Sequence, residues 1–174
     1  MKNIIAFAGS NSKNSINKQL ATYASSLVEN VAVQILDLND YALPIYGIDE
    51  ETENGIPANA TKFLSLIENS DGIILSLAEH NGSYTVAFKN ILDWMSRIDK
   101  SIFKNKPMLL MATSPGARGG KTVLETAKNA FPRFGANLVG DFSLPSFFDN
   151  FKENEITNEA LNSQLKELVA EFKN

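Results

Sequence analysis

The sequence contains no cysteine and a single histidine, His80. Without these residues the chain can form no disulfide scaffold, no Cys/His zinc site and no cysteine nucleophile, so we predict no metal centre. The formal net charge is −4, and the 16 Lys and Arg residues are scattered rather than gathered into a basic stripe. This distribution argues against a nucleic acid as partner.

Long hydrophobic runs are also missing. The first apolar run, residues 4–8, is too short for the core of a signal peptide, and no run approaches the ~20 apolar residues that span a bilayer. We therefore expect a soluble, cytoplasmic protein without a membrane partner. The 174 residues are close to the usual size of one domain, so we expect a single domain over residues 1–174.

Short apolar runs alternate with amphipathic stretches, which is typical of βαβ units that build a parallel sheet. The strands predicted from these runs are Asn3–Ala8, Val31–Leu36, Gly72–Leu77, Pro107–Thr113 and Asn137–Phe142. The helices predicted from spacings of three and four are Ser15–Val28, Ala58–Asn69, Tyr84–Ile98, Lys121–Phe131 and Thr157–Phe172. The middle three strands are apolar nearly throughout, so we expect helices on both of their faces. We favour the strand order 2-1-3-4-5 in a three-layer α/β/α sandwich.

Residues 39–57 lie between a predicted strand and a predicted helix and are interpreted as a long loop. Four of them are acidic, namely Asp49, Glu50, Glu51 and Glu53. Because the surrounding turn residues predict no rigid ligand cage, we interpret these carboxylates as solvated charges rather than as a metal cluster.

Ligands of open parallel sheets bind at the carboxyl ends of the strands, where the strand order reverses. The loop 9–17 connects the first predicted strand directly to a helix, and Ser10, Ser12 and Ser15 supply three hydroxyls within it. Free N–H groups at a helix N-terminus attract anions, and small hydroxyls add donors without bulk. We predict a phosphate site here, against the simpler interpretation that Ser15 or Asn14 only caps the helix.

The loop 78–83 follows the third predicted strand. Gly82 permits a positive φ and a close approach of the backbone, so a tight turn here can present N–H and C=O groups to the edge of a planar heterocycle. Ser83 is also a candidate N-cap. His80 has no Asp or Ser partner at a recognisable spacing and no G-x-S-x-G motif is present, so we predict no catalytic side chain.

The loop 114–122 follows the fourth predicted strand and nearly matches a P-loop. Gly120, Lys121 and Thr122 fit the end of G-x-x-x-x-G-K-[ST], but Pro115 stands where the first glycine is required. Proline fixes φ and offers no N–H to a phosphate. This mismatch argues against a nucleoside triphosphate as ligand.

The three loops, in this order and spacing, resemble those of the NADPH-dependent FMN reductase family, which includes quinone, azo-dye and chromate reductases. The family pattern G-S-x-R-x-x-S-x-N is similar to Gly9, Ser10, Ser15 and Asn17. The patterns P-E-Y-N-x-S and L-K-N-x-I-D-W are similar to Glu79, Asn81, Ser83, Lys89, Asn90, Asp93 and Trp94. The sequence departs from the family at Ser12, which replaces an arginine, at Leu77 and Ala78, which replace Thr-Pro, and at His80, which replaces a tyrosine.

The resemblance implies a flavodoxin-like fold, FMN as cofactor, NADPH or NADH as co-substrate, and a small-molecule electron acceptor such as a quinone, a free flavin or an azo compound. It also implies a homodimer or homotetramer. By resemblance the FMN phosphate contacts Ser10, Ser12, Ser15, Ile16 and Asn17. By the same resemblance the flavin ring contacts Ala78, Glu79, His80, Asn81, Gly82, Ser83, Ser114, Pro115, Gly116 and Gly119.

Two further contacts were weighed on the same grounds. Phe147, Phe148 and Phe151 either cover the flavin of a partner subunit or pack locally, and Arg118 either meets the NADPH phosphate or is solvated. The alternatives to a reductase are a flavodoxin-like electron carrier without NAD(P)H turnover, a P-loop nucleotide hydrolase and a flavin-free binding module. The sequence leaves open which acceptor is used and which nicotinamide is preferred.

Overall fold

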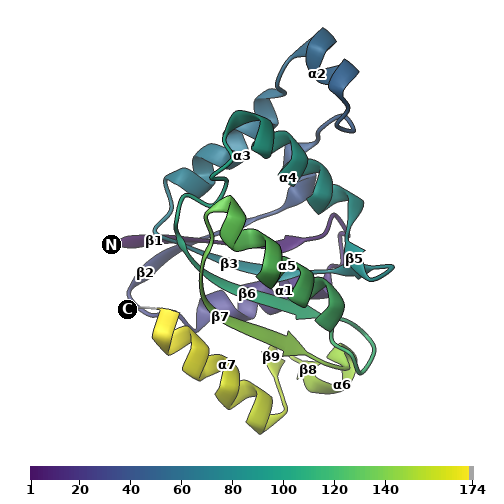
Figure 1. The fold of residues 1–174 in the computed structure, drawn as a ribbon. Helices are drawn as coiled ribbons and strands as arrows, with labels where there is room; N and C mark the ends of the chain where they lie inside the picture. Colours follow the sequence, from purple (N-terminus) through teal and green to yellow (C-terminus); the bar gives the residue numbers. More distant parts are fainter. Residues whose placement is uncertain (173–174) are drawn as a thin grey trace.

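A computed structural model of the protein describes residues 1–172 and contains a five-stranded parallel sheet at its centre (Figure 1). The strands of this sheet are β1 (Lys2–Gly9), β2 (Val31–Leu36), β3 (Gly72–Leu77), β6 (Pro107–Thr113) and β7 (Asn137–Leu144). Their spatial order is β2-β1-β3-β6-β7, so the predicted order 2-1-3-4-5 is confirmed. The order reverses between β1 and β3, where Ile5 lies beside Ile73.

Helices cover both faces of the sheet and make three layers. The main helices are α1 (Ile16–Ser26), α3 (Ala58–Glu68), α4 (Val86–Ile98), α5 (Lys121–Ala130) and α7 (Glu159–Phe172). Side chains of β1 alternate between the two cores because successive residues of a strand point to opposite faces. Ile5 and Phe7 pack with α3, α4 and α5, whereas Ile4 and Ala6 pack with α1 and α7. The flavodoxin-like sandwich expected from the sequence is therefore confirmed.

The strand β2 was expected to be covered on both faces, and this expectation was wrong. β2 lies at an edge of the sheet, and the side chains of Val33 and Ile35 are each 38% exposed. By contrast, every residue of β3, in the centre of the sheet, is buried. An apolar run thus indicates a strand here without indicating whether the strand lies in the middle or at the edge.

Residues 39–57 were expected to form a plain loop, but the structure contains two short helices in this region. These are the 3-10 helix η1 (Leu38–Tyr41) and the helix α2 (Ile48–Asn54), which projects from the body of the molecule (Figure 1). One of the four carboxylates is not free, because Glu51 forms an ion pair with Arg97 of α4 at 2.9 Å. Within residues 1–172, no group of three or more acidic or histidine side chains is placed to hold a metal ion.

Several element boundaries differ from the predicted ones. The segment expected to begin a helix at Tyr84 instead forms the hairpin β4 (Glu79–His80) and β5 (Ser83–Tyr84), and α4 begins at Val86. Between β7 and α7 the chain forms α6 (Phe147–Asn150), β8 (Phe151–Lys152) and β9 (Glu155–Ile156), and the 3-10 helix η2 (Phe131–Phe134) precedes β7. No helix in residues 1–172 has the length and apolar character needed to cross a bilayer.

Candidate functional site

The loops that follow β1, β3 and β6 meet at one edge of the sheet and enclose a cavity of about 200 Å³. The structure brings ten of the predicted site residues to its wall, namely Ser10, Ser12, Ser15, Ile16, Asn17, Ala78, Glu79, His80, Ser114 and Pro115. Asn14 and Thr113 complete the lining. Three loops that are far apart in the sequence therefore share one site, as the parallel topology predicts.

The N-terminus of α1 opens into this cavity. Ser15 is its N-cap, and the Ser15 hydroxyl oxygen accepts a hydrogen bond from the main-chain N–H of Lys18 at 3.1 Å. The main-chain N–H groups of Ile16 and Asn17, at the first two positions of the helix, have no acceptor in the part of the chain that the structure describes. Capping by Ser15 therefore leaves two free amide donors at the positive end of the helix dipole, facing the cavity.

The side chain of Asn17 has a structural role that sequence reasoning missed. It is buried, its carboxamide oxygen accepts hydrogen bonds from the Ser76 hydroxyl at 2.7 Å and the Thr113 N–H at 3.0 Å, and its N–H donates to the Thr113 carbonyl at 3.1 Å. These bonds join α1 to the ends of β3 and β6. Asn17 can therefore serve a ligand in the cavity through its main chain, while its side chain fixes the position of the helix.

The second loop is a hairpin with the two-residue turn Asn81-Gly82, whose φ angles are 52° and 75°. Positive φ at both central residues is characteristic of the type I′ turn favoured in short hairpins. The positive φ expected of Gly82 is confirmed, and the dipeptide Asn-Gly was the signal from which the hairpin could have been predicted. The turn directs the side chain of Glu79 away from the loop and toward α5.

The Glu79 carboxylate accepts a hydrogen bond from the main-chain N–H of Val123 at 2.9 Å. Val123 lies in the first turn of α5, whose N-cap residue Gly120 has a φ of 73° and offers no side chain. Glu79 thus caps a helix that begins 42 positions further along the sequence, at Lys121. The helix terminus that resembles a P-loop already holds a carboxylate of the chain itself, which leaves little attraction for a triphosphate.

Five predicted residues lie outside the cavity wall, namely Asn81, Gly82, Ser83, Gly116 and Gly119. Asn81, Gly82 and Ser83 form the end of the hairpin, and Gly116 faces open space. Gly119 is buried against β7, where an added Cβ would lie 2.5 Å from the Ser143 hydroxyl. Glycine is required there because the turn that precedes α5 has a positive φ of 57° and approaches β7 closely.

The structure shows the surroundings of the three phenylalanines after β7 and of Arg118. Phe147 and Phe151 are buried and stack on each other with ring centroids 4.7 Å apart, so they pack locally. Phe148 is 63% exposed. The guanidinium of Arg118 donates a hydrogen bond to the Thr122 hydroxyl at 2.6 Å and lies at the surface.

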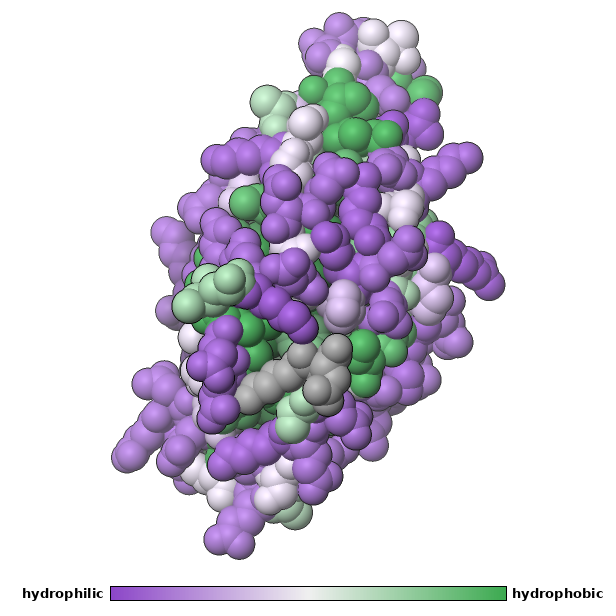
Figure 2. Space-filling view, turned by 90° about the vertical axis from the view of Figure 1, so that its left-hand side faces the viewer, coloured by the Kyte–Doolittle hydropathy of each residue, from purple (hydrophilic) through white to green (hydrophobic). Residues whose placement is uncertain are grey.

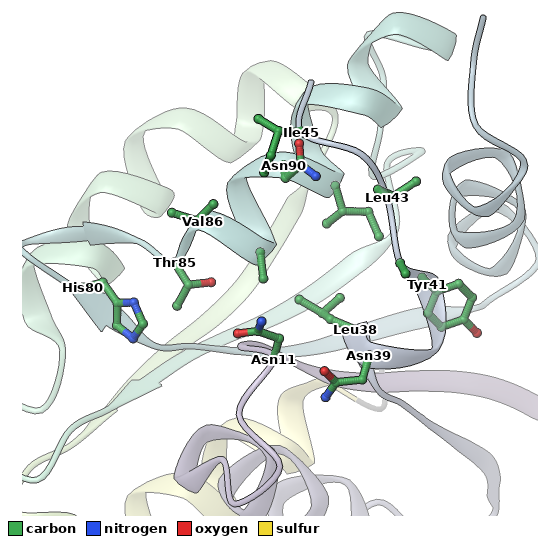
Figure 3. Close-up of a pocket in the computed structure, with 13 residues that line it drawn as sticks. Asn11, Leu38, Asn39, Tyr41, Leu43, Ile45, His80, Thr85, Val86 and Asn90 are labelled. Carbon is green, nitrogen blue, oxygen red and sulfur yellow. The ribbon is translucent and has the colours of Figure 1, made fainter. Parts of the chain in front are cut away.

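A second, larger cavity of about 360 Å³ adjoins the first at His80, which lines both (Figure 3). Its remaining walls come from Asn11, from the stretch 38–45 and from the beginning of α4. Sequence reasoning missed this cavity because residues 39–57, which supply much of its wall, were interpreted as a long loop. No sequence motif in residues 38–45 indicates that they line a cavity.

The helix α1 is also anchored by charge. Lys18 and Asp37, which precedes η1, form an ion pair at 2.5 Å. Partial burial alone would raise the pKa of the Asp37 carboxyl, but hydrogen bonds from Lys18 and Asn39 outweigh this and lower it. Lys18 is therefore already paired, and the free donors around the cavity are mainly neutral.

This donor set suits a doubly charged phosphate ester. Two free amides at a helix terminus and the Ser10 and Ser12 hydroxyls surround the cavity, and Glu79, the acidic residue in its wall, points its carboxylate at α5. The main chain of the other two loops can offer hydrogen bonds to a planar group attached to that phosphate. The arrangement resembles a mononucleotide site at a topological switch point.

Comparisons with known proteins agree with this geometry. The sequence profile of the family described as NADPH-dependent FMN reductase matches residues 2–149. A quinone reductase of Escherichia coli strain K12 is 30% identical over 122 residues, which cover 67% of this chain and 62% of that protein. An NADPH:quinone oxidoreductase of Arabidopsis thaliana is 26% identical over an alignment of 179 residues, covering 95% of this chain and 87% of that protein. The solved structure of FerB, a flavoenzyme NAD(P)H:(acceptor) oxidoreductase from Paracoccus denitrificans, superposes with a TM-score of 0.78 at 26% identity and covers 99% of this chain and 95% of that one.

Proposed function

The chain belongs to the NADPH-dependent FMN reductase family, and from this premise we propose how its residues hold FMN and which acceptors it reduces. FMN and NAD(P)H are accordingly its cofactor and co-substrate. The resemblance recognised in the loop motifs is confirmed. The roles of individual residues and the nature of the acceptor are our proposal.

We place the FMN phosphate at the N-terminus of α1. The observation that carries this assignment is the pair of unpaired amides of Ile16 and Asn17, which face a cavity that also receives the Ser10, Ser12 and Ser15 side chains. Hydrogen bonds to a charged group are each worth about 1.5–3 kcal/mol, so two amides can bind a phosphate firmly without an arginine. Ser12 therefore removes one charged contact of the family pattern without removing the site.

The flavin ring extends from this phosphate toward the other two loops. Its contacts would be Ala78 to Ser83, Ser114 to Gly116, and Gly119, largely through main-chain groups. FMN, when bound, supplies the two-electron redox chemistry, and no side chain of the protein has to act as acid, base or nucleophile. The chain's contribution is to hold the ring in place, to offer it hydrogen bonds and to exclude water.

We propose that the reaction oxidises NAD(P)H and reduces a small organic acceptor such as a quinone, a free flavin or an azo compound. For a quinone the balance is the loss of one hydride from the nicotinamide and the gain of two electrons and two protons by the quinone, with one proton taken from solvent. The quinone reductase relatives support this choice of acceptor. The protein would work in the cytoplasm as one domain.

We also propose a homodimer or homotetramer. Several large apolar side chains are exposed on and beside the projecting α2, where hydrophobic residues gather near the top of Figure 2. Among them is Ile48 at 62% exposure. Burial of such side chains against a second copy would be favourable, at about 25 cal/mol per Å². Sedimentation equilibrium of the holoprotein measures the state, and a monomer at micromolar concentration would contradict it.

The test of the function combines a spectrum with turnover. After addition of FMN and gel filtration, the protein should retain the yellow flavin absorbance and should oxidise NADPH or NADH in the presence of menadione. A yellow protein that is inert to both nicotinamides would instead be a one-electron carrier. A colourless protein would be a flavin-free binding module.

A further inference from the structure

The larger cavity differs in the chemistry of its lining from the smaller cavity at the N-terminus of α1, where we place the FMN phosphate and which is called the phosphate cavity below. Its apolar lining includes Leu38, Leu43, Ile45, Val86 and Ile91. Its polar lining consists mainly of neutral groups, among them the carboxamides of Asn11, Asn39 and Asn90. Among the lining residues that the structure describes, none is Lys, Arg, Asp or Glu. Such a lining suits an uncharged ring system with a few hydrogen-bond acceptors.

The cavity is open to solvent on one side and closed at its base. Leu38 and Ile91 are 7% and 2% exposed and form the floor, whereas Ile45 and Val86 are 70% and 69% exposed at the rim. Figure 3 shows His80 at the end opposite Leu43 and Tyr41, with Asn11 and Asn39 along one side. A molecule can therefore enter past the rim and come to rest against His80.

Hydrogen bonds hold the wall formed by residues 43–46 against α4. Asn90 donates to the Pro44 carbonyl at 2.9 Å and accepts from the Tyr46 N–H at 2.8 Å. The indole of Trp94 donates to the same Pro44 carbonyl at 2.8 Å, and its ring packs edge-on against the ring of Tyr46. The cavity is thus preformed by a segment of irregular chain that is fixed at several points.

The volume of about 360 Å³ lies within the range of about 300–1,000 Å³ found for small-molecule sites. The phosphate cavity, at about 200 Å³, falls below that range and can hold only part of FMN. A flavin that extends from Ser10 and Ser15 toward His80 ends beside the wall that the two cavities share.

We propose that the larger cavity is the acceptor subsite and that it selects neutral quinones with fused or alkylated rings. This inference rests on the proposed function. The apolar floor takes the ring, and His80 lies at the boundary with the cofactor site. The Asn11 carboxamide offers N–H donors to a quinone carbonyl, and Asn39, which already donates one N–H to Asp37 at 2.8 Å, offers its second. The lack of a cationic side chain in the lining disfavours sulfonated dyes and the phosphate-bearing part of NADPH, because their charges would lose hydration without gaining a partner.

A pair of tryptophan substitutions tests the assignment in the FMN-loaded protein. Val86→Trp fills the rim of the cavity, and Val33→Trp places the same side chain at an exposed position of the edge strand β2 that does not line it. For Val86→Trp the KM for menadione should rise about tenfold or more, as expected when an apolar pocket is obstructed, with the FMN affinity and the KM for NADPH within about twofold of wild type. Val33→Trp should leave all three constants unchanged. An unchanged menadione KM in Val86→Trp would overturn the proposal.

A binding experiment separates this subsite from the proposed function itself. We expect 1-naphthol, a redox-inactive analogue, to shift the amide NMR signals of Asn11, Asn39 and Leu43, both with and without FMN, and FMN to shift those of Ile16 and Asn17. If FMN displaces naphthol and shifts Asn39 and Leu43 itself, the flavin ring occupies the cavity and the subsite is disproved while the reductase stands. If FMN shifts nothing, the proposed function fails while the naphthol result still decides the pocket.

Discussion

Two helices begin at the same edge of the sheet, and their N-termini differ in what fills them. At α1 the N-cap Ser15 leaves the amides of Ile16 and Asn17 free toward a cavity. At α5 the N-cap Gly120 contributes no side chain, yet the carboxylate of Glu79 reaches across from the neighbouring loop and takes the Val123 N–H. The terminus that looks more like a phosphate loop in sequence is therefore the one already occupied.

The comparison shows that a helix N-terminus becomes an anion site only where the fold leaves its amides unpaired. A motif describes the local backbone, whereas the competing ligand can come from 44 positions earlier in the chain, as Glu79 does for the Val123 N–H of α5. Substitutions at both termini and in the elements that support them test this contrast.

The largest effect is expected from a negative charge at the open terminus. Ser12→Asp places a carboxylate beside the bound phosphate, and repulsion between charges about 5 Å apart is worth roughly 3 kcal/mol at an effective dielectric of about 20. The Kd for FMN, measured by quenching of flavin fluorescence, should rise about a hundredfold or more. Lys121→Asp at the occupied terminus is the matched control and should change it less than about threefold. Equal losses in both variants would contradict the contrast.

Removal of the carboxylate from the occupied terminus should have the next largest effect. Glu79→Ala deletes the cap of α5 and should lower the free energy of unfolding by about 1 kcal/mol, measured by urea denaturation. Because the vacated amides can then bind an anion, added sulfate should stabilise this variant more than wild type. Glu79→Gln, which keeps an oxygen acceptor, should retain most of the stability. A sulfate response identical to that of wild type would show that the carboxylate does not occupy an anion site.

The hairpin that contains Glu79 ends at Tyr84, a residue that lowers the stability of the fold. The Tyr84 hydroxyl is buried without a hydrogen-bond partner in residues 1–172, and burial raises the pKa of the phenol to about 12. Tyr84→Phe should raise the free energy of unfolding by about 1 kcal/mol, since an unsatisfied polar group is removed. Tyr23→Phe, which loses a bond to Asn162 of 2.7 Å, should lower it and serves as a control of opposite sign.

The raised pKa of Tyr84 also gives a pH dependence. Because the folded-state pKa, about 12, exceeds the ordinary value of 10.0, the unfolded chain loses the phenol proton first. This ionisation has no effect on stability below pH 10 and lowers the free energy of unfolding between pH 10 and 12. Wild type should therefore lose stability faster than Tyr84→Phe in this range. If the free energies of unfolding of the two proteins fell in parallel over this range, the folded-state pKa of Tyr84 would not be raised.

The smallest effect concerns the ion pair that anchors α1. Asp37→Asn should lower the free energy of unfolding by about 0.5 kcal/mol, because partly exposed pairs contribute little. Since the folded-state pKa of Asp37 lies below its ordinary value of 3.8, its contribution is present above that pH and disappears as the pH falls through the lowered pKa. Thermal denaturation of wild type and variant should differ near pH 6 and converge in strong acid. A difference that persists in acid would assign the effect to something other than the ion pair.

The sequence predicted the five strands from apolar runs and their order from a common arrangement of βαβ units. The structure also brings ten of the predicted site residues to the wall of the smaller cavity. Apolar runs define strands, and the small polar residues after β1 end at a helix. Prediction from the sequence failed where residues far apart in the chain act together. Nothing near Glu79 indicates that it caps α5, and the bonds of Asn90 and Trp94 that turn residues 43–46 into a wall depend on the packing of α4.

Apolar composition also could not distinguish an edge strand from a central one. β2 and β3 have similar sequences, but Val33 is 38% exposed and Ile73 is fully buried. The two strands differ in exposure because β3 lies between β1 and β6, whereas β2 has a neighbouring strand on one side only. Local sequence carries that information only indirectly.

The central claim is that the open N-terminus of α1 holds the phosphate of FMN, and the affinities of the wild-type protein for FMN and riboflavin test it most directly. The two ligands differ only in the phosphate. Fluorescence titrations should give a Kd for FMN at least about a hundredfold lower than that for riboflavin, as expected for two or more charge-assisted hydrogen bonds. Affinities within about twofold of each other would contradict the account.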